Sequence, residues 1–427
     1  MRRFDLAGVG IGPFNLSLAA LADPLDLDVV LFDARPEFRW HPGLLVDGAT
    51  LQVPFLADLV SLVDPTSRHS FLNYLRERGR LLPFYFAERF HLPRAEYDDY
   101  GRWAAARLPS CRFGHEVTGL RWVPEEDAFE LGGTDPVLAE AVVLGVGTQP
   151  SVPEPLQPLV SAPDVLALHS ADYLTHRADL LAAERVTVVG SGQSGAEVFL
   201  DLLRARSTVD GLRWLARTPA FAPMEYSKLG LEQFTPDYTK FFHGLPEPVR
   251  DELLPSQWQL YQGIDAETMA AIHDELYRRS IGGGWPEAVL TPGVEVVSAK
   301  VGDDIELSLQ QVQQGIMGTH RTSAVVAATG YAETPTGPLL QGLGDAVRRD
   351  AKGRLVIGAD YRVQLDVPGS LFVQNAERHT HGPGAPDLGL GAWRAAAILN
   401  AVCGKTVYDL PERTAFTTFG LDQTEDL

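Results

Sequence analysis

The sequence has little cysteine, no long hydrophobic run and few basic residues for its length. Its 427 residues include two cysteines, Cys111 and Cys403, which lie far apart and form no CxxC motif. This excludes a disulfide scaffold, a zinc ribbon and a dithiol redox centre. No apolar stretch approaches the roughly 20 residues that cross a bilayer, so we expect no membrane insertion. The N-terminal segment lacks the apolar core of a signal peptide, which favours a cytoplasmic protein.

Basic residues are also too few to support nucleic-acid binding. The chain has 36 Lys and Arg against 56 Asp and Glu, a formal net charge of −20. Such a surface repels a phosphate backbone, and no basic cluster offsets it, so we expect no nucleic-acid partner. The same charge would attract a small cationic substrate, although solubility alone also accounts for an acidic surface.

The chain contains the pattern of strand, glycine turn, helix and second strand twice. Residues 4–10 read as a strand, 14–22 as a helix and 28–33 as a second strand that ends in an acid. The pattern returns at 185–190 and is followed by a helical segment and another strand. We therefore predict an α/β fold with two Rossmann-like dinucleotide-binding domains.

The first glycine turn has the residues that hold a dinucleotide pyrophosphate. Gly8 permits the tight turn, Gly10 lets the backbone approach the phosphates, and Gly12 precedes the helix. Pro13 suits the first helical turn, where its missing N–H costs nothing. Asp33 ends the second strand, where an acid accepts a hydrogen bond from a ribose hydroxyl.

The second turn repeats the arrangement with Gly190, Gly192 and Gly195. Its second strand ends at Arg217 rather than at an acid. An arginine pairs with a 2′-phosphate that an acid would repel, although Arg217 could also be an ordinary surface cation. The two turns therefore indicate FAD at the first site and NADPH at the second, with electrons passed to O2 or another external acceptor.

Composition along the chain predicts where the domains divide. The proline-rich stretch 150–163 reads as a connector, and 221–283 lacks strand patterning and reads as a helical insertion. No histidine, cysteine or carboxylate group has metal-ligand spacing, so we expect no metal site. The predicted parts are an FAD-binding domain (1–165 and 331–427), an NADPH-binding domain (166–220 and 284–330) and a small helical substrate-binding region (221–283).

Six segments, in this order, resemble the lysine/ornithine N-monooxygenase family, the microbial N-hydroxylating flavin monooxygenases of siderophore biosynthesis. They are VGIGPFNLSLA (9–19), FRWHPGLLVDGATLQVPFLADLVSLVDPTS (38–67), PRAEYDDYGRWAA (93–105), GSGQSGAE (190–197), ATGY (328–331) and HTHGPGAPDLGLGAWRAA (379–396). Together they span most of the chain.

The resemblance implies roles for residues near the flavin. It places Trp40 and His41 beside the cofactor, and Gln52 at the isoalloxazine or the peroxide as a catalytic residue. It places the catalytic Arg94 between flavin and nicotinamide. The alternatives are a core aromatic for Trp40, a glutamine satisfied by backbone groups, and a surface ion pair of Arg94 with Glu96 or Asp98.

It also implies contacts in the second half of the chain. Gln193 and Ser194 would bind the NADPH pyrophosphate, and Thr329 would lie at a strand-to-loop junction near the cofactors. A C-terminal loop would return to the flavin. Gly389 stands in that loop where many family members carry serine, so we expect backbone contact there. The predicted loop contacts are Leu388, Gly389 and Leu390.

One departure from the family concerns the substrate. Members that accept lysine or ornithine carry, in the segment that reads FLADLV here, a lysine for the substrate carboxylate; this chain has Ala57. Leu231 and Leu260 fall near positions where ornithine-type members have asparagine. A site without carboxylate ligands favours a diamine, putrescine or cadaverine, as substrate. The alternative is lysine or ornithine, with another base such as Lys228 supplying the charge.

The resemblance implies that NADPH reduces FAD and that O2 then forms a C4a-hydroperoxyflavin, which hydroxylates a neutral primary amine. An NADPH oxidase or flavin reductase without amine hydroxylation shares every nucleotide motif and remains an alternative function.

A carboxylate or an aromatic side chain would bind the distal ammonium, and Glu225, Glu232 and Asp237 are equal candidates. The resemblance further implies a homo-oligomer, either a dimer or a tetramer.

Overall fold

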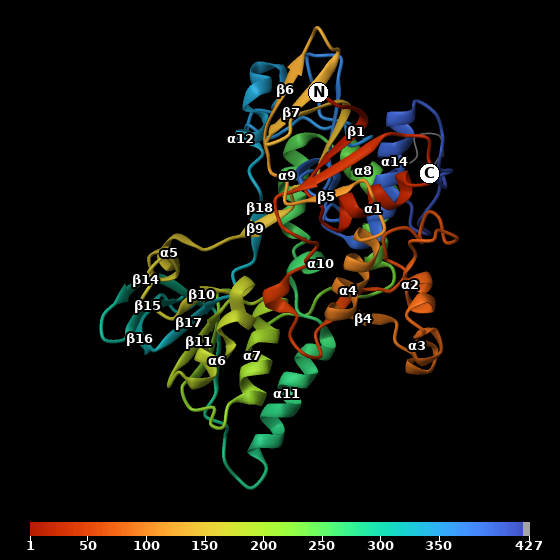
Figure 1. The fold of residues 1–427 in the computed structure, drawn as a ribbon. Coiled ribbons are helices and arrows are strands. Elements are labelled where there is room, and N and C mark those ends of the chain that lie inside the picture. Colours follow the sequence, from red (N-terminus) through yellow and green to blue (C-terminus); the bar gives the residue numbers. More distant parts are fainter. Residues whose placement is uncertain (422–427) are drawn as a thin grey trace.

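The computed structural model describes residues 1–421 and contains two large sheets, each with its own apolar core (Figure 1). In the first sheet, five strands run parallel and two add an antiparallel edge. Its order is β5 (Cys111–Phe113), β2 (Val29–Asp33), β1 (Arg3–Val9), β8 (Val137–Leu144), β7 (Ala128–Gly133) and β6 (Val117–Val123), with β19 (Ser370–Val373) paired to the second half of β8.

The second sheet has five strands, all parallel. Its strands are short, nearly continuous apolar runs, as expected for a sheet that helices cover on both faces. The order is β10 (Ala167–His169), β17 (Ala324–Ala327), β11 (Val186–Val189), β12 (Leu212–Ala216) and β13 (Val289–Pro292).

Three small sheets complete the strand inventory of the described residues. The antiparallel strands β14 (Val294–Val301), β15 (Ile305–Gln311) and β16 (Ile316–Thr322) form one of them. The pairs β3 (Thr50–Pro54) with β4 (His91–Pro93) and β9 (Thr148–Pro150) with β18 (Tyr331–Glu333) form the others. The sequence pattern did not predict the antiparallel strands of either unit.

Helices pack on the sheets according to their apolar faces. In α1 (Pro13–Ala22), every residue after Pro13 is buried, and α1 lies against α14 (Gly391–Cys403) beneath the first sheet. On the second sheet, α7 (Gln193–Ala205) has one apolar face and packs against α11 (Ala266–Ser280). The remaining α-helices are α2 (Phe71–Glu77), α3 (Leu81–Ala87), α4 (Arg94–Ala105), α5 (Gln157–Val160), α6 (Tyr173–Ala182), α8 (Pro236–Gly244), α9 (Glu247–Ser256), α10 (Gln259–Gln262), α12 (Gly337–Leu340) and α13 (Arg378–His381). Short 3-10 helices are η1 (Pro42–Leu44), η2 (Glu154–Leu156), η3 (Ser170–Asp172), η4 (Gly230–Phe234), η5 (Gln341–Ala346) and η6 (Leu388–Leu390).

The predicted α/β class with two Rossmann-like units is confirmed. The predicted connector 150–163 is not extended throughout, because it forms η2 and α5 and buries Leu156 and Leu159 in a small apolar cluster. The helical segment 221–283 divides its contacts: α8 packs on α13 beside the first sheet, whereas α11 packs on α7 of the second. The exact domain boundaries stay a prediction.

No helix within residues 1–421 is long and apolar enough to cross a membrane.

A buried ion pair anchors the C-terminal part of the first unit. Glu377 and Arg394 are almost completely shielded from solvent and contact each other directly. Arg394 also donates to the Ala385 carbonyl at 2.8 Å and lies over the ring of Phe14. Breaking such a pair from one side leaves an uncompensated buried charge, which is strongly destabilising.

We therefore expect Arg394→Met to lower the free energy of unfolding, measured by urea denaturation, by about 3–5 kcal/mol. Burial raises the pKa of the Glu377 carboxyl, so the variant's stability should fall as the pH rises above about 4, where the unfolded carboxyl begins to ionise. Arg2→Met, which breaks an exposed pair with Asp28, is the control and should cost under about 1 kcal/mol. Equal losses in both variants would contradict this interpretation.

Candidate functional site

A cavity of about 1250 Å³ lies where the carboxyl ends of the two parallel sheets face each other. Both glycine turns open into it, so the structure brings most of the predicted cofactor residues together. Those that line it are Gly10, Gly12, Pro13, Asp33, Trp40, His41, Gln52, Gly190, Gly192, Gln193, Ser194, Arg217, Thr329 and Leu388. Gly8, Arg94, Gly195, Gly389, Leu390 and the three predicted substrate residues lie outside this lining.

The first glycine turn is shaped for a close ligand. Gly10 has φ +86°, and a methyl group there would lie 2.5 Å from the Gly145 carbonyl oxygen. At Gly8 an added methyl group would lie 2.8 Å from the Leu31 Cγ, a side-chain contact. At Gly12 an added methyl group would meet no described atom within 4 Å, and no side chain caps the helix that follows. The free N–H groups of α1 therefore face open space that can accept a phosphate.

Asp33 is engaged by protein groups in this structure. Its carboxylate accepts hydrogen bonds from the Ile11 N–H at 2.7 Å and from the backbone and guanidinium of Arg35. Burial opposes its ionisation, but these bonds outweigh burial and hold the pKa of Asp33 below its usual value. They use the roughly four lone-pair positions of a carboxylate. An incoming ribose hydroxyl would therefore have to replace one of the Arg35 bonds.

The second turn has nearly the same backbone as the first. Gly192 has φ −92° and ψ −176°, against −87° and −178° at Gly12, and both begin a helix without a side-chain cap. At Gly195 an added methyl group would lie 2.5 Å from the Gly190 carbonyl oxygen. Gly195 thus serves close packing of helix and strand, as the third glycine of such turns does.

The polar side chains around the second turn differ in whether protein groups already bind them. Arg217 is 77% exposed and lies 3.5 Å from Glu295, which leaves it mobile enough to meet a 2′-phosphate. The Gln193 amide is already bonded to Glu197, Thr268 and the Asp265 N–H. Its predicted pyrophosphate contact would therefore come from its backbone N–H rather than from the side chain.

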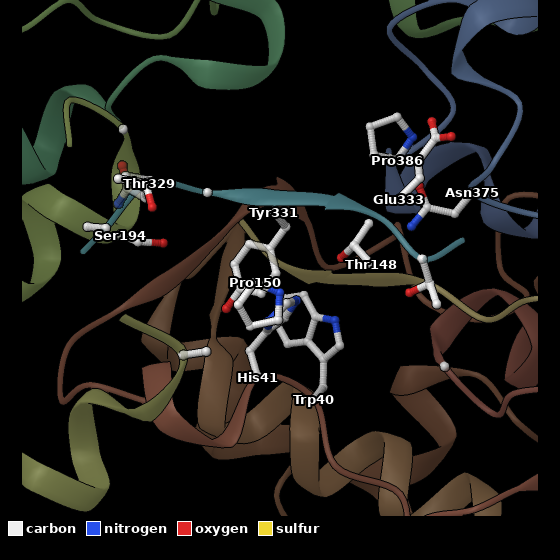
Figure 2. Close-up of a pocket in the computed structure, with 18 of the residues that line it drawn as sticks. Trp40, His41, Thr148, Pro150, Ser194, Thr329, Tyr331, Glu333, Asn375 and Pro386 are labelled. Carbon is white, nitrogen blue, oxygen red and sulfur yellow. The ribbon is translucent and has the colours of Figure 1, made fainter. Parts of the chain in front are cut away.

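Aromatic rings form the wall between the two turns. Trp40 and His41 meet edge to face at 5.0 Å, and His41 meets Tyr331 at 5.2 Å. Figure 2 shows Tyr331 above His41 and Trp40, with Pro150 beside them. Burial, with help from the charges of Arg94 and Arg35, lowers the pKa of His41 to about 4, so this imidazole is neutral at physiological pH.

Gln52 has a buried side-chain amide without a partner. Its Nε2 atom makes no hydrogen bond to any described residue, although the side chain lines the cavity. This contradicts the alternative in which backbone groups satisfy the amide. A buried orphan donor costs about 1–3 kcal/mol, which a bound acceptor would remove. Gln52 therefore has a free donor at the cavity wall, and its role toward the flavin stays a prediction.

Arg94 joins the two units instead of forming a surface pair. Its Nη1 lies 2.7 Å from Glu197 Oε2, and both side chains are nearly buried. Arg94 begins α4 on the first unit, and Glu197 belongs to α7 on the second. The expected alternatives, Glu96 and Asp98, bind other groups. The charge of Arg94 still reaches His41 and Tyr331 in the cavity wall.

The other predicted residues differ in how close they lie to the cavity. Thr329 Oγ1 donates to the Ser151 carbonyl at 2.5 Å, which indicates a structural role beside the cavity. Ala57 is buried and close to Gly389, because an ideal methyl group on Gly389 would lie 4.0 Å from the Ala57 Cβ. Leu260 is buried next to the cavity residue Tyr261, whereas Leu231 is 38% exposed and outside the lining.

The candidate charged residues of the helical segment do not reach the cavity. Lys228 is exposed and outside its lining. Glu232 accepts bonds from the Phe416 and Thr417 N–H groups, and Asp237 accepts from Thr414 and Ala415. Both carboxylates therefore hold the C-terminal segment. Glu225 binds the N–H group of Ser227, two residues away.

Sequence reasoning missed several residues of the lining. Tyr331 and Pro386 lie inside the quoted segments but were given no role, and Tyr261, Asn375 and Arg378 were not considered. Figure 2 shows Asn375, Pro386 and Glu333 close together at one end of the site. The positive φ of 63° at Asn375 is a structural signal that no sequence pattern announces.

The buried bridge between the units predicts strong coupling. In a double-mutant cycle of Arg94→Met and Glu197→Gln, we expect a coupling energy of about 1–3 kcal/mol in the free energy of unfolding. The exposed Arg321–Glu306 pair, mutated in the same way, is the control and should give under about 1 kcal/mol. Additive losses at Arg94 and Glu197 would mean that the bridge does not form in solution.

Comparison with known proteins agrees with this geometry. The profile of a family described as L-lysine 6-monooxygenase/L-ornithine 5-monooxygenase matches residues 2–333. The rhizobactin siderophore biosynthesis protein RhbE of Rhizobium meliloti is 42% identical over 100% of this chain and 97% of that protein. A putrescine N-hydroxylase of Shewanella oneidensis is 40% identical over 97% and 84%. The crystal structure of DfoA from Erwinia amylovora, a FAD-bound cadaverine monooxygenase of desferrioxamine biosynthesis, superposes with a TM-score of 0.93 at 36% identity over 100% of both chains. The chain therefore belongs to the L-lysine 6-monooxygenase/L-ornithine 5-monooxygenase family.

Proposed function

We propose that this protein is an FAD- and NADPH-dependent monooxygenase that N-hydroxylates one primary amine of an aliphatic diamine, putrescine or cadaverine, in siderophore biosynthesis. The observation that carries the choice of substrate is Ala57, a buried methyl where amino-acid-hydroxylating members carry the lysine for a carboxylate. A putrescine N-hydroxylase and a cadaverine monooxygenase among the relatives support the same choice.

The residues present fit both cofactors. FAD would be held by the open turn at Gly12 and Pro13 and by the orphan amide of Gln52, with Trp40 and His41 beside the ring. NADPH would be held by the Gly192 turn, the Ser194 backbone and hydroxyl, and the mobile guanidinium of Arg217. When bound, the two cofactors supply the hydride and the activated oxygen.

The chain's own task is to exclude water and to present a neutral amine. His41 is uncharged, and the charges of Asp33 and Arg94 are each paired with a protein partner. Placing the amine lone pair in line with the oxygen and keeping water away are the two effects that favour hydroxylation over release of peroxide.

Lysine or ornithine is the second candidate substrate, and one residue favours it. Arg378 lines the cavity, with its guanidinium 5.4 Å from the ring centre of Tyr261. A cation there can receive an α-carboxylate. Lys228 has no such position, because it is exposed and lies outside the cavity lining.

Product analysis separates these candidates. With purified protein, FAD, NADPH and O2, we expect hydroxylamine from putrescine or cadaverine and little from lysine or ornithine. Hydrogen peroxide is measured in parallel, because uncoupled NADPH oxidation would otherwise pass for turnover. Product from the amino acids alone would keep the family chemistry and refute the diamine assignment. Peroxide without hydroxylamine from any amine would favour the NADPH oxidase alternative.

The two similar glycine turns allow a matched test of the cofactor sites. Alanine is compatible with the backbone at both Gly12 and Gly192, so neither substitution should unfold the protein. We expect Gly12→Ala to weaken FAD binding about tenfold or more, a loss of about 1.4 kcal/mol, and Gly192→Ala to raise the KM for NADPH similarly while FAD stays bound. Loss of FAD from Gly192→Ala would contradict the assignment of the two sites.

We also propose that the protein is cytoplasmic and forms a homo-oligomer, a dimer or tetramer. The resemblance of the chain to its family supports both statements. Size-exclusion chromatography with light scattering measures the oligomeric state directly, and a monomer at micromolar concentration would refute it.

A further inference from the structure

We propose that Asp387 binds the distal ammonium group of the substrate and so selects diamines over amino acids. The inference rests on the proposed function and adds a specificity residue to it. Asp387 was not among the acidic residues expected to do this, because it lies far along the chain from the helical segment.

Asp387 stands directly beside the position where the family's lysine is replaced. It caps η6, and its Oδ1 accepts a hydrogen bond from the Gly389 N–H at 2.6 Å. Both Asp387 and Ala57 lie on the side of Gly389 where a side chain would project. A methyl group added at Gly389 would lie 2.7 Å from Asp387 Oδ1 and 4.0 Å from the Ala57 Cβ. Asp387 and Ala57 are therefore both neighbours of Gly389, and Ala57 stands where the family's lysine would be.

The Asp387 carboxylate can still accept from a ligand. The Gly389 N–H bonds to Oδ1 and the Leu390 N–H also acts on the carboxylate, but no side chain of the described residues donates to Asp387. Asp387 itself lies just outside the cavity lining, but its neighbours Pro386 and Leu388 belong to it, and Figure 2 shows Pro386 at one end of the site. An ammonium entering there would find an acceptor without displacing a protein bond.

A second polar group nearby has no partner. The hydroxyl of Tyr226 is buried and makes no hydrogen bond to a described residue. Burial, with help from the charges of Asp265, Asp387 and Glu267, raises the pKa of this phenol. An ammonium has three donors, so a carboxylate and a phenol oxygen suit it well.

Electrostatics favour a cation over a carboxylate at this position. Burial raises the pKa of Asp387 to about 6, against the opposing influence of the Gly389 N–H and of Arg394. Arg394 itself is neutralised by Glu377. An ammonium would relieve the cost of a shielded carboxylate, whereas the α-carboxylate of lysine or ornithine would be repelled. The loss of lysine at Ala57 and the presence of Asp387 thus act in the same direction.

The test compares a diamine with a monoamine of the same length. Asp387→Asn keeps the size of the side chain and the acceptor that caps η6. We expect it to raise the KM for cadaverine and its calorimetric Kd, measured on FAD-loaded protein with NADP+, by about 10- to 100-fold. The KM for 1-aminopentane, which has no distal ammonium, should stay within about twofold. Glu225→Gln, which alters an acid already bonded to the Ser227 N–H, is the control and should change neither value.

The outcomes separate this inference from the proposed function. Equal changes for the diamine and the monoamine, or no change for either, would overturn the role of Asp387 while diamine hydroxylation by the unmodified protein stands. If the unmodified protein forms no hydroxylamine but binds cadaverine in an Asp387-dependent way, the proposed reaction fails and the ammonium site stands. If it does not bind either diamine, both fail. FAD content and thermal melting check that each variant is folded.

Discussion

The site depends on one constraint: two of the segments that run between the two units pair with each other. β9 and β18 form a short antiparallel ladder, continued by a hydrogen bond from the Ser151 N–H to the Gly330 carbonyl (Figure 1). His169 bonds to the same carbonyl at 3.0 Å. With these segments joined in this way, the carboxyl ends of both sheets face a common cavity. Without that arrangement, cofactors bound at the two glycine turns could not meet in one cavity.

The charges around the cavity are paired across long sequence distances. Asp33 is bound by Arg35, Arg94 by Glu197, and Glu377 by Arg394, while His41 stays neutral. These pairs satisfy shielded charges and hold the walls in place. Arg217 and Arg378 are two charged residues of the lining that stay open to a ligand.

The sequence located both glycine turns, but it did not indicate what the acids of the helical segment bind. The glycine turns could be recognised because each acts within a few residues, where φ and steric space are local properties. The acids at the substrate end are a different case. Glu232 and Asp237 are in the predicted region, yet they bind residues 414–417, which lie far away in sequence. No local pattern distinguishes an acid that caps a distant segment from one that awaits a ligand.

The sequence by itself determined the α/β class, the two turns and the absence of a lysine at Ala57. The hydrophobic periodicity and the conformation of the glycine turns depend on residues close in sequence, so these features can be recognised without the fold. Only the tertiary structure decided that Arg94 pairs with Glu197 rather than with Glu96 or Asp98, and that Asp387 lies beside Ala57. These partners come from segments that are distant in sequence. The packing of whole helices decides which charged side chains become neighbours, and no single segment determines that packing.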